Sequence, residues 1–165
     1  MGECEDRLVR YGGHAAAAGL TIDEGQLSHF RDDFCEAVSI QAKEHALEPE
    51  IVIDAEVPFG QLNLNVLDQI DMLAPFGEGN PRPLLCSTDV TLKAPATKMG
   101  KSERHLSVQF AQGNKTIRAV AFNAADWCEE LNETDGPLRI AYRPVINEFR
   151  GYKNVEMHLV DWKSV

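Results

Sequence analysis

The sequence lacks any long run of apolar residues, although apolar residues themselves are plentiful. Hydrophobic residues make up 44% of its 165 positions, which is ordinary for a globular protein and enough for a buried core. No apolar stretch approaches the roughly 18 residues that a membrane-spanning helix needs. The composition therefore predicts one or two small globular domains and no membrane as a partner.

Cysteine is scarce and widely spaced. The four cysteines form no CxxC pair; they are Cys4, Cys35, Cys86 and Cys128. Closely spaced cysteines are typical of zinc sites and of the disulfide frameworks of small secreted proteins. We therefore expect reduced thiols and a cytoplasmic location.

Positive charge is also in short supply. Sixteen Lys and Arg residues stand against 26 Asp and Glu residues, a net charge of −10, which argues against a generic nucleic-acid binder. Residues 93–122 are the exception, with six basic residues against Glu103 alone and a local net charge of +5. The six are Lys93, Lys98, Lys101, Arg104, Lys115 and Arg118. This asymmetry predicts a surface for a polyanion on an otherwise acidic chain.

The N-terminal part has a mainly helical pattern. Residues 3–10 resemble the end of a helix, and Gly12-Gly13 would stop it because glycine readily adopts the left-handed conformation of a helix C-terminus. Residues 17–22 are expected to form a short buried strand.

A second helix is expected over residues 23–46, with Pro49 ending it. Asp23 followed by Gln26 resembles a capping box at its start. Apolar residues recur at helical spacing along it and predict a buried stripe. The stripe consists of Leu27, Phe30, Phe34, Val38 and Ala42.

The remainder is rich in strand patterns. We expect a strand over residues 50–58, a helix over 62–73, and a rigid connecting loop, PFGEGNPRP, over 75–83. From residue 84 onward the pattern predicts five short strands, with one helix between the third and the fourth. The strands are expected at 84–96, 104–111, 115–123, 137–147 and 153–162, and the helix at 124–131. This order is that of an OB-fold barrel, so the fold class is α+β, and alternation places Phe110 and Phe122 in the core.

The stretch from Tyr11 to Leu20, YGGHAAAAGL, allows two interpretations. Adjacent glycines let backbone amides approach a ligand, and an imidazole beside them suits a phosphate. The alternative is a glycine helix cap followed by a tightly packed alanine strand.

Three motifs resemble one family. GGHAAAAG at 12–19 is similar to the GGHxxAAG signature of the DHHA1 domain of DHH phosphoesterases. LAPFGEGNPRP at 73–83 resembles the LxPFGxGNPxP segment of the RecJ family of single-strand-specific exonucleases, and NEFRGYK at 147–153 resembles a hairpin in its C-terminal OB domain. Together they span nearly the whole chain in the family's order.

The resemblance implies a C-terminal fragment of such an exonuclease, used in DNA repair and recombination. It divides the chain into the end of a DHHA1 domain at 1–48, a connector at 49–83 and an OB domain at 84–165. In the family a DHH domain holds Mg²⁺ or Mn²⁺. This chain has no Asp-His-His sequence and its histidines are scattered, so the fragment alone is expected to bind no metal and to be inactive.

The resemblance also implies which residues meet single-stranded DNA. Gly12, Gly13 and His14 would hold a phosphate of the strand. The OB surface would contribute charge and stacking rings. Its expected contacts are Lys98, Lys101, Arg104, Arg118, Arg143, Phe149, Arg150, Tyr152 and Lys153.

Two other functions stay open at this point. In the first, the barrel is a protein-interaction module that docks the nuclease to repair partners. The acidic composition favours this alternative. Another DHHA1 protein, such as an oligonucleotide phosphatase or an aminoacyl-tRNA editing domain, is disfavoured by the OB pattern. The apolar stripe of the second helix also predicts a dimer of the fragment.

Overall fold

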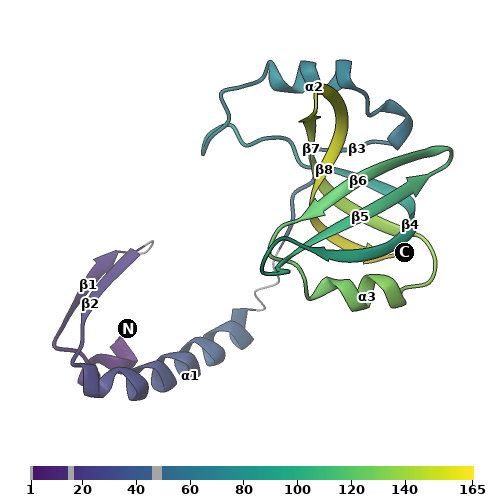
Figure 1. Cartoon of the computed structure of the whole chain (residues 1–165). Helices are drawn as coiled ribbons and strands as arrows, with labels where there is room; N and C mark the ends of the chain where they lie inside the picture. Colours follow the sequence, from purple (N-terminus) through teal and green to yellow (C-terminus); the bar gives the residue numbers. More distant parts are fainter. Residues whose placement is uncertain (1, 15–16, 46–49) are drawn as a thin grey trace. The chain divides into compact units, whose positions relative to one another are not determined.

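The computed structural model describes residues 2–14, 17–45 and 50–165. They fall into two compact units, Met1–Glu50 and Ile51–Val165, which are both drawn in Figure 1. Among the described residues, no helix is long and apolar enough to cross a membrane.

The first unit combines a two-stranded ribbon with one long helix. A 3-10 helix, η1 (Gly2–Arg7), precedes an antiparallel ribbon of β1 (Arg10–His14) and β2 (Ala17–Thr21). The strand expected at 17–22 is confirmed, but all five residues of β2 are exposed rather than buried. Apolar composition suggested burial, yet burial depends on which element covers a strand.

The expected helix end at Gly12-Gly13 is wrong, because both glycines lie inside β1. Gly13 pairs with Ala18, and a Cβ built on Gly13 would lie only 2.6 Å from the Ala18 Cα atom. The glycine is therefore needed for the close approach of two strands, which is a common use of glycine in sheets.

The long helix, α1 (Leu27–His45), follows a short 3-10 turn, η2 (Glu24–Gln26). The expected capping box does not form, because the Asp23 side chain makes no capping hydrogen bond. Instead the backbone N–H of Gln26 donates to the Asp23 carbonyl, as in a 3-10 turn. The predicted helix end, at Ala46 and Pro49, lies outside the described residues.

The predicted stripe of α1 is largely exposed within this unit. Leu27, Phe34 and Val38 are exposed, while Phe30 is half-buried and stacks on Phe34 with ring centroids 5.6 Å apart. The helical spacing is confirmed and the burial is not. The dimer that would cover this stripe stays a prediction.

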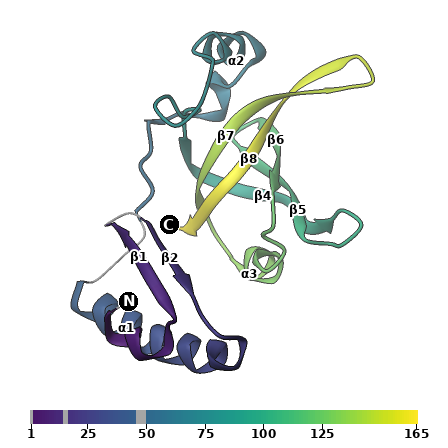
Figure 2. The same ribbon diagram turned by 90° about the vertical axis from the view of Figure 1, so that its left-hand side faces the viewer.

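The second unit is built on a closed barrel, and five strands form it in the order β4-β5-β6-β8-β7, with β7 returning to β4. Its strands are β4 (Leu85–Met99), β5 (His105–Gln112), β6 (Lys115–Ala121), β7 (Leu138–Phe149) and β8 (Tyr152–Ser164). All neighbours are antiparallel except β6 and β8, which are parallel. This closed order confirms the OB-fold expected from the sequence. Figure 2 shows the ring of strands, with the β7–β8 hairpin extending beyond it.

The elements around the barrel differ slightly from expectation. Of the strand expected at 50–58, the structure forms only β3 (Ala55–Glu56), which pairs in parallel with β4. A 3-10 turn, η3 (Phe59–Gln61), and a helix, α2 (Leu64–Asp71), follow it. The helix between the third and fourth barrel strands is α3 (Trp127–Glu133). In Figures 1 and 2, α2 and α3 lie at opposite ends of the barrel.

Side chains from outside the strands complete the core. Phe59 and Leu62, near η3, and Leu131 of α3 are fully buried in the same cluster as the inward residues of the barrel. Asn132 ties α3 to β4, since its side-chain amide accepts from the Ala96 N–H at 2.7 Å and donates to the Ala96 carbonyl at 3.1 Å. These bonds satisfy the backbone where the β4–β5 register is irregular.

The loop PFGEGNPRP forms a hydrogen-bonded turn. Gly77 and Asn80 form a bridge, and the Asn80 side chain donates to the carbonyls of Leu73 and Pro75 at 2.9 and 3.0 Å. Arg82 lies over the Phe76 ring at 4.5 Å and pairs with Asp71 at 2.8 Å. These contacts give the loop the defined shape expected of a rigid connector.

Buried hydrogen bonds link the residue after β3 to β4 and β7. The Ser87 hydroxyl donates to the Val57 carbonyl at 2.5 Å and lies 2.8 Å from the Tyr142 hydroxyl. Because the single Ser87 proton is used on Val57, Tyr142 is the donor of the second bond. Burial raises the pKa of Tyr142 to about 12.

We expect Ser87→Ala to destabilise the barrel more than Tyr142→Phe. Ser87→Ala leaves a buried hydroxyl without a partner, at a cost of about 1–3 kcal/mol, whereas Tyr142→Phe removes one bond and costs about 1 kcal/mol. Both tryptophans, Trp127 and Trp162, lie in this unit, so urea unfolding followed by their fluorescence measures the effect. An equal or larger loss for Tyr142→Phe would contradict the role of Ser87 as the shared partner of Val57 and Tyr142.

Candidate nucleic-acid interface

The strand alternation defines one outer face of the barrel. Inward residues of β5 and β6 are buried, and their neighbours in sequence point outward. The outer face is made by the outward side chains of β5, β6, β8 and β7, which are adjacent in the sheet order. Its members include His105, Ser107, Arg118, Phe122, Arg143, Asn147, Glu156 and His158.

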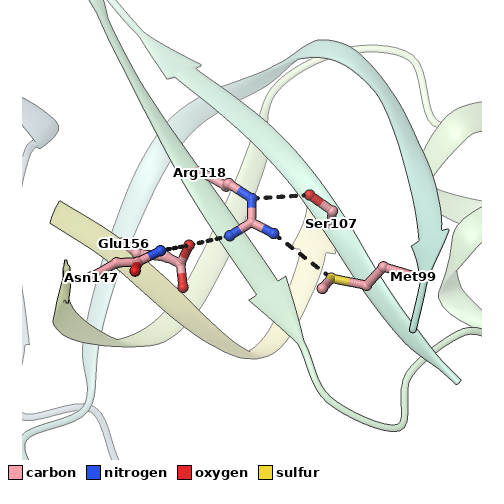
Figure 3. Close-up of polar contacts among 5 residues, drawn as sticks. All are labelled: Met99, Ser107, Arg118, Asn147 and Glu156. Carbon is pink, nitrogen blue, oxygen red and sulfur yellow. Dashed lines mark hydrogen bonds and ion pairs between the residues drawn. The ribbon is translucent and has the colours of Figure 1, made fainter. Parts of the chain in front are cut away.

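Arg118 lies at the centre of this face within a polar network (Figure 3). Its guanidinium donates to the Glu156 carboxylate, to the Ser107 hydroxyl at 3.2 Å, and to the Met99 sulfur at 3.8 Å. Asn147 donates to the same Glu156 oxygen at 2.9 Å. Glu156 is only 8% exposed, so its charge is balanced by Arg118 rather than by water.

Three rings lie side by side at one edge of the outer face. Phe122, directly after β6, meets His105 with centroids 5.4 Å apart and His158 with centroids 5.0 Å apart, both edge to face. The His105 Nδ1 atom accepts from the Asn123 N–H at 2.9 Å. Phe122 is nevertheless 55% exposed.

The charge state of His158 follows from its surroundings. Burial lowers the pKa of His158, Arg82 and Arg143 lower it further, and Glu156 opposes them. On balance these surroundings favour the neutral imidazole. The guanidinium groups of Arg82 and Arg143 therefore act electrostatically on His158.

The β7–β8 hairpin presents a second aromatic group. Phe149 and Tyr152 face each other across the hairpin and are 65% and 75% exposed. Arg150 and Gly151 both have positive φ, as a tight hairpin turn requires. Arg150 lies over the Phe149 ring at 5.2 Å. The hairpin tip thus combines exposed rings with a cation.

Some predicted contact residues lie elsewhere on the unit. Lys101 and Arg104 belong to the connection between β4 and β5, where Arg104 donates to the Ser102 hydroxyl at 3.0 Å. Lys98 pairs with Leu106 in the β4–β5 register, so it points to the opposite side of the ladder from Ser107. Lys153 pairs with Glu148 at 3.8 Å.

The structure therefore brings together only some of the DNA-contact residues that were expected on the OB surface. Arg118, Arg143, Phe149 and Tyr152 share the outer face, with Arg150 at the hairpin turn. Gly12, Gly13 and His14 belong to β1 in the first unit. No three His, Cys, Asp or Glu side chains gather as a metal site within the described parts of the chain.

Comparison with known proteins decides the family. Residues 53–161 match the family model described as the RecJ OB domain. The chain belongs to the RecJ OB-domain family. This confirms the resemblance and the OB fold, and the matched range includes the segment ahead of the barrel that supplies Phe59 and Leu62.

Relatives of this RecJ OB-domain chain agree along nearly its whole length. The single-stranded-DNA-specific exonuclease RecJ of Haemophilus influenzae is 30% identical over 161 residues, which cover 94% of this chain and 27% of that protein. RecJ of Escherichia coli is 28% identical over 155 residues, with 91% and 26% covered. The structure of Thermus thermophilus RecJ in complex with Mn²⁺ is similar with a TM-score of 0.65 and 26% identity, covering 99% of this chain and 23% of that one. The chain therefore spans about a quarter of the length of these relatives.

Sequence reasoning missed two residues of this RecJ OB domain. Phe122 was expected in the core, which is wrong because it is exposed on the outer face. Its exposure could have been predicted from its spacing to Arg118, because residues i and i+4 of one strand lie on the same face. Phe110, expected in the core in the same way, is fully buried. Nothing in the sequence pointed to Glu156 as the partner of Arg118, because their pairing requires the parallel β6–β8 contact.

We expect Arg118→Met to destabilise the barrel by about 2–4 kcal/mol, because it strips a buried carboxylate of its cation. The double variant Arg118→Met, Glu156→Gln should recover most of that loss, since the uncompensated charge is gone. Urea unfolding followed by tryptophan fluorescence measures both. Simple additivity of the Arg118→Met and Glu156→Gln losses would contradict the pairing.

Proposed function

We propose that this chain is the C-terminal, DNA-binding portion of a bacterial, cytoplasmic, RecJ-like 5′→3′ single-stranded-DNA exonuclease that acts in DNA repair and recombination. The observation that carries the proposal is the outer face, where exposed rings and guanidinium groups lie together on a barrel of the RecJ OB-domain family. OB barrels hold single strands by stacking bases on aromatic rings and by pairing phosphates with cations. The relatives named above are themselves called single-stranded-DNA-specific exonucleases.

The role of the barrel in this proposal is to hold and guide the strand. Arg143 and Arg150 supply charge for phosphates, and Phe149 and Tyr152 supply stacking surface. Arg118 mainly maintains the face, because Glu156 neutralises it. Lys98, Lys101 and Arg104 extend the positive charge along the β4–β5 connection.

Hydrolysis belongs to a part of the parent protein outside this chain. The Thermus relative was solved with Mn²⁺ and also with Mg²⁺, and metal-assisted hydrolysis needs several carboxylate or imidazole ligands around the ion. The described residues of this chain do not fit such a centre. In the parent, Gly12, Gly13 and His14 are proposed to hold a phosphate of the strand by backbone amides and an imidazole.

A second candidate function is a protein-docking module for repair partners. The observation that favours it is a hollow in the second unit that combines apolar walls with two cations. Its walls include Ile51, Ile53 and Trp162, with Arg139, Asp161 and Lys163 beside them. This arrangement suits an apolar segment with polar or charged flanks.

Titration with fluorescent oligonucleotides at two salt concentrations tests the proposed function. We expect tighter binding to single strands than to duplex, with affinity falling steeply as salt rises, because bound phosphates release counterions. The double variant Lys101→Ala, Arg104→Ala should make the slope of log K against log salt concentration less steep, by roughly 0.7 per lost phosphate contact. Lys163→Ala, in the hollow, is the matched control and should bind DNA normally. Equal affinity for both DNA forms would favour the docking module instead.

We also expect His14→Ala to lower exonuclease turnover in the full-length parent with little effect on folding. The reason is the loss of a phosphate contact from β1, where His14 is exposed. Initial rates on 5′-labelled single-stranded DNA measure the effect, with His29→Ala as a control on another exposed histidine. Unchanged turnover would rule out the phosphate-binding role.

A further inference from the structure

Phe122 is a large apolar side chain that the barrel leaves in solvent. It follows β6 on the outer face, and 55% of its surface is exposed. Phe110, on the neighbouring strand, is fully buried. Exposed aromatic residues on an OB barrel are the usual surface for stacking bases.

The ring of Phe122 is held in place from two sides. The imidazoles of His105 and His158 meet it at interplanar angles of 70° and 89°. His105 is itself fixed, because its Nδ1 atom accepts from the Asn123 N–H. A ring oriented in advance loses little side-chain entropy when a ligand binds.

Cationic groups lie beside these rings. Arg143 is opposite His158 in the β7–β8 register. Arg82 of the connecting loop also lowers the pKa of His158, although its own charge is paired with Asp71 at 2.8 Å. The aromatic edge therefore offers flat rings at its centre and the positive charge of Arg143 at its border. A nucleotide has the matching parts, a flat base and an anionic phosphate.

We propose that Phe122, oriented by His105 and His158, is a stacking platform for one base of single-stranded nucleic acid, and that Arg143, opposite His158, binds a neighbouring phosphate. This proposal rests on the proposed function and adds a residue to it. Stacking is tolerant of sequence because every base has a π-face. The platform therefore contributes affinity without base preference.

Binding of this chain to fluorescent single-stranded DNA tests the proposal with three variants. We expect Phe122→Ala to weaken binding by about 5- to 150-fold, the range found for loss of one stacked base, with the salt dependence unchanged. Phe122→Trp should retain affinity, because it keeps a stacking ring. Arg143→Ala should weaken binding and reduce the slope of log K against log salt concentration by roughly 0.7. Phe34→Ala, on α1 of the first unit, is the matched control and should have no effect.

A second measurement separates stacking from a structural role. In the Phe122→Trp variant, stacking on a base should quench the added indole fluorescence relative to the parent chain, and thermal melts should show the barrel intact. Equal loss of affinity in Phe122→Ala and Phe122→Trp, or no quenching, would overturn the platform. Normal binding by Phe122→Ala would overturn it too, while leaving the proposed function in place. Failure of the unsubstituted chain to bind single strands would overturn both, and competition by an apolar acidic peptide at this edge would assign it to a protein partner.

Discussion

The parallel pairing of β6 with β8 is the contact on which the rest of the barrel depends. It joins the β4–β5–β6 meander to the β7–β8 hairpin, and the β4–β7 pairing then closes the ring. Closure leaves no unpaired sheet edge among these five strands. It also gives each strand an inner and an outer side. Inward side chains fill the interior together with Phe59, Leu62 and Leu131, so the outer side chains remain available for polar contacts and ligands.

The same contact explains the electrostatics of the outer face. In the β6–β8 register Arg118 lies opposite Glu156, and Asn147 reaches the same carboxylate from β7. A buried carboxylate with two donors ties three strands together. One consequence is that Arg118, whose charge alone suggested a DNA contact, mainly stabilises the barrel by pairing with Glu156. The cations left to meet a phosphate lie at the borders of the face, near Phe122 and at the hairpin tip.

The two units differ in how well their apolar side chains are covered. The barrel has a continuous core with helices at both ends. In the first unit, Leu27, Phe34, Val38 and Ile40 of α1 are exposed. There the ion pair of Arg7 with Asp33 at 3.0 Å joins η1 to α1. Burial of this helix depends on surfaces beyond those the unit itself provides.

Local patterns in the sequence determined the long helix α1, the five barrel strands, α3 and the family motifs. These depend on alternation, turn residues and short spacings that one segment carries by itself. Tertiary structure decided the rest. Gly12-Gly13 became part of a strand because a neighbouring strand approaches Gly13 closely. Phe122 became a surface ring and Arg118 an ion-pair partner because closure of the barrel sets which strands are neighbours. Strand pairing of this kind involves segments far apart in the sequence, so no single segment determines it.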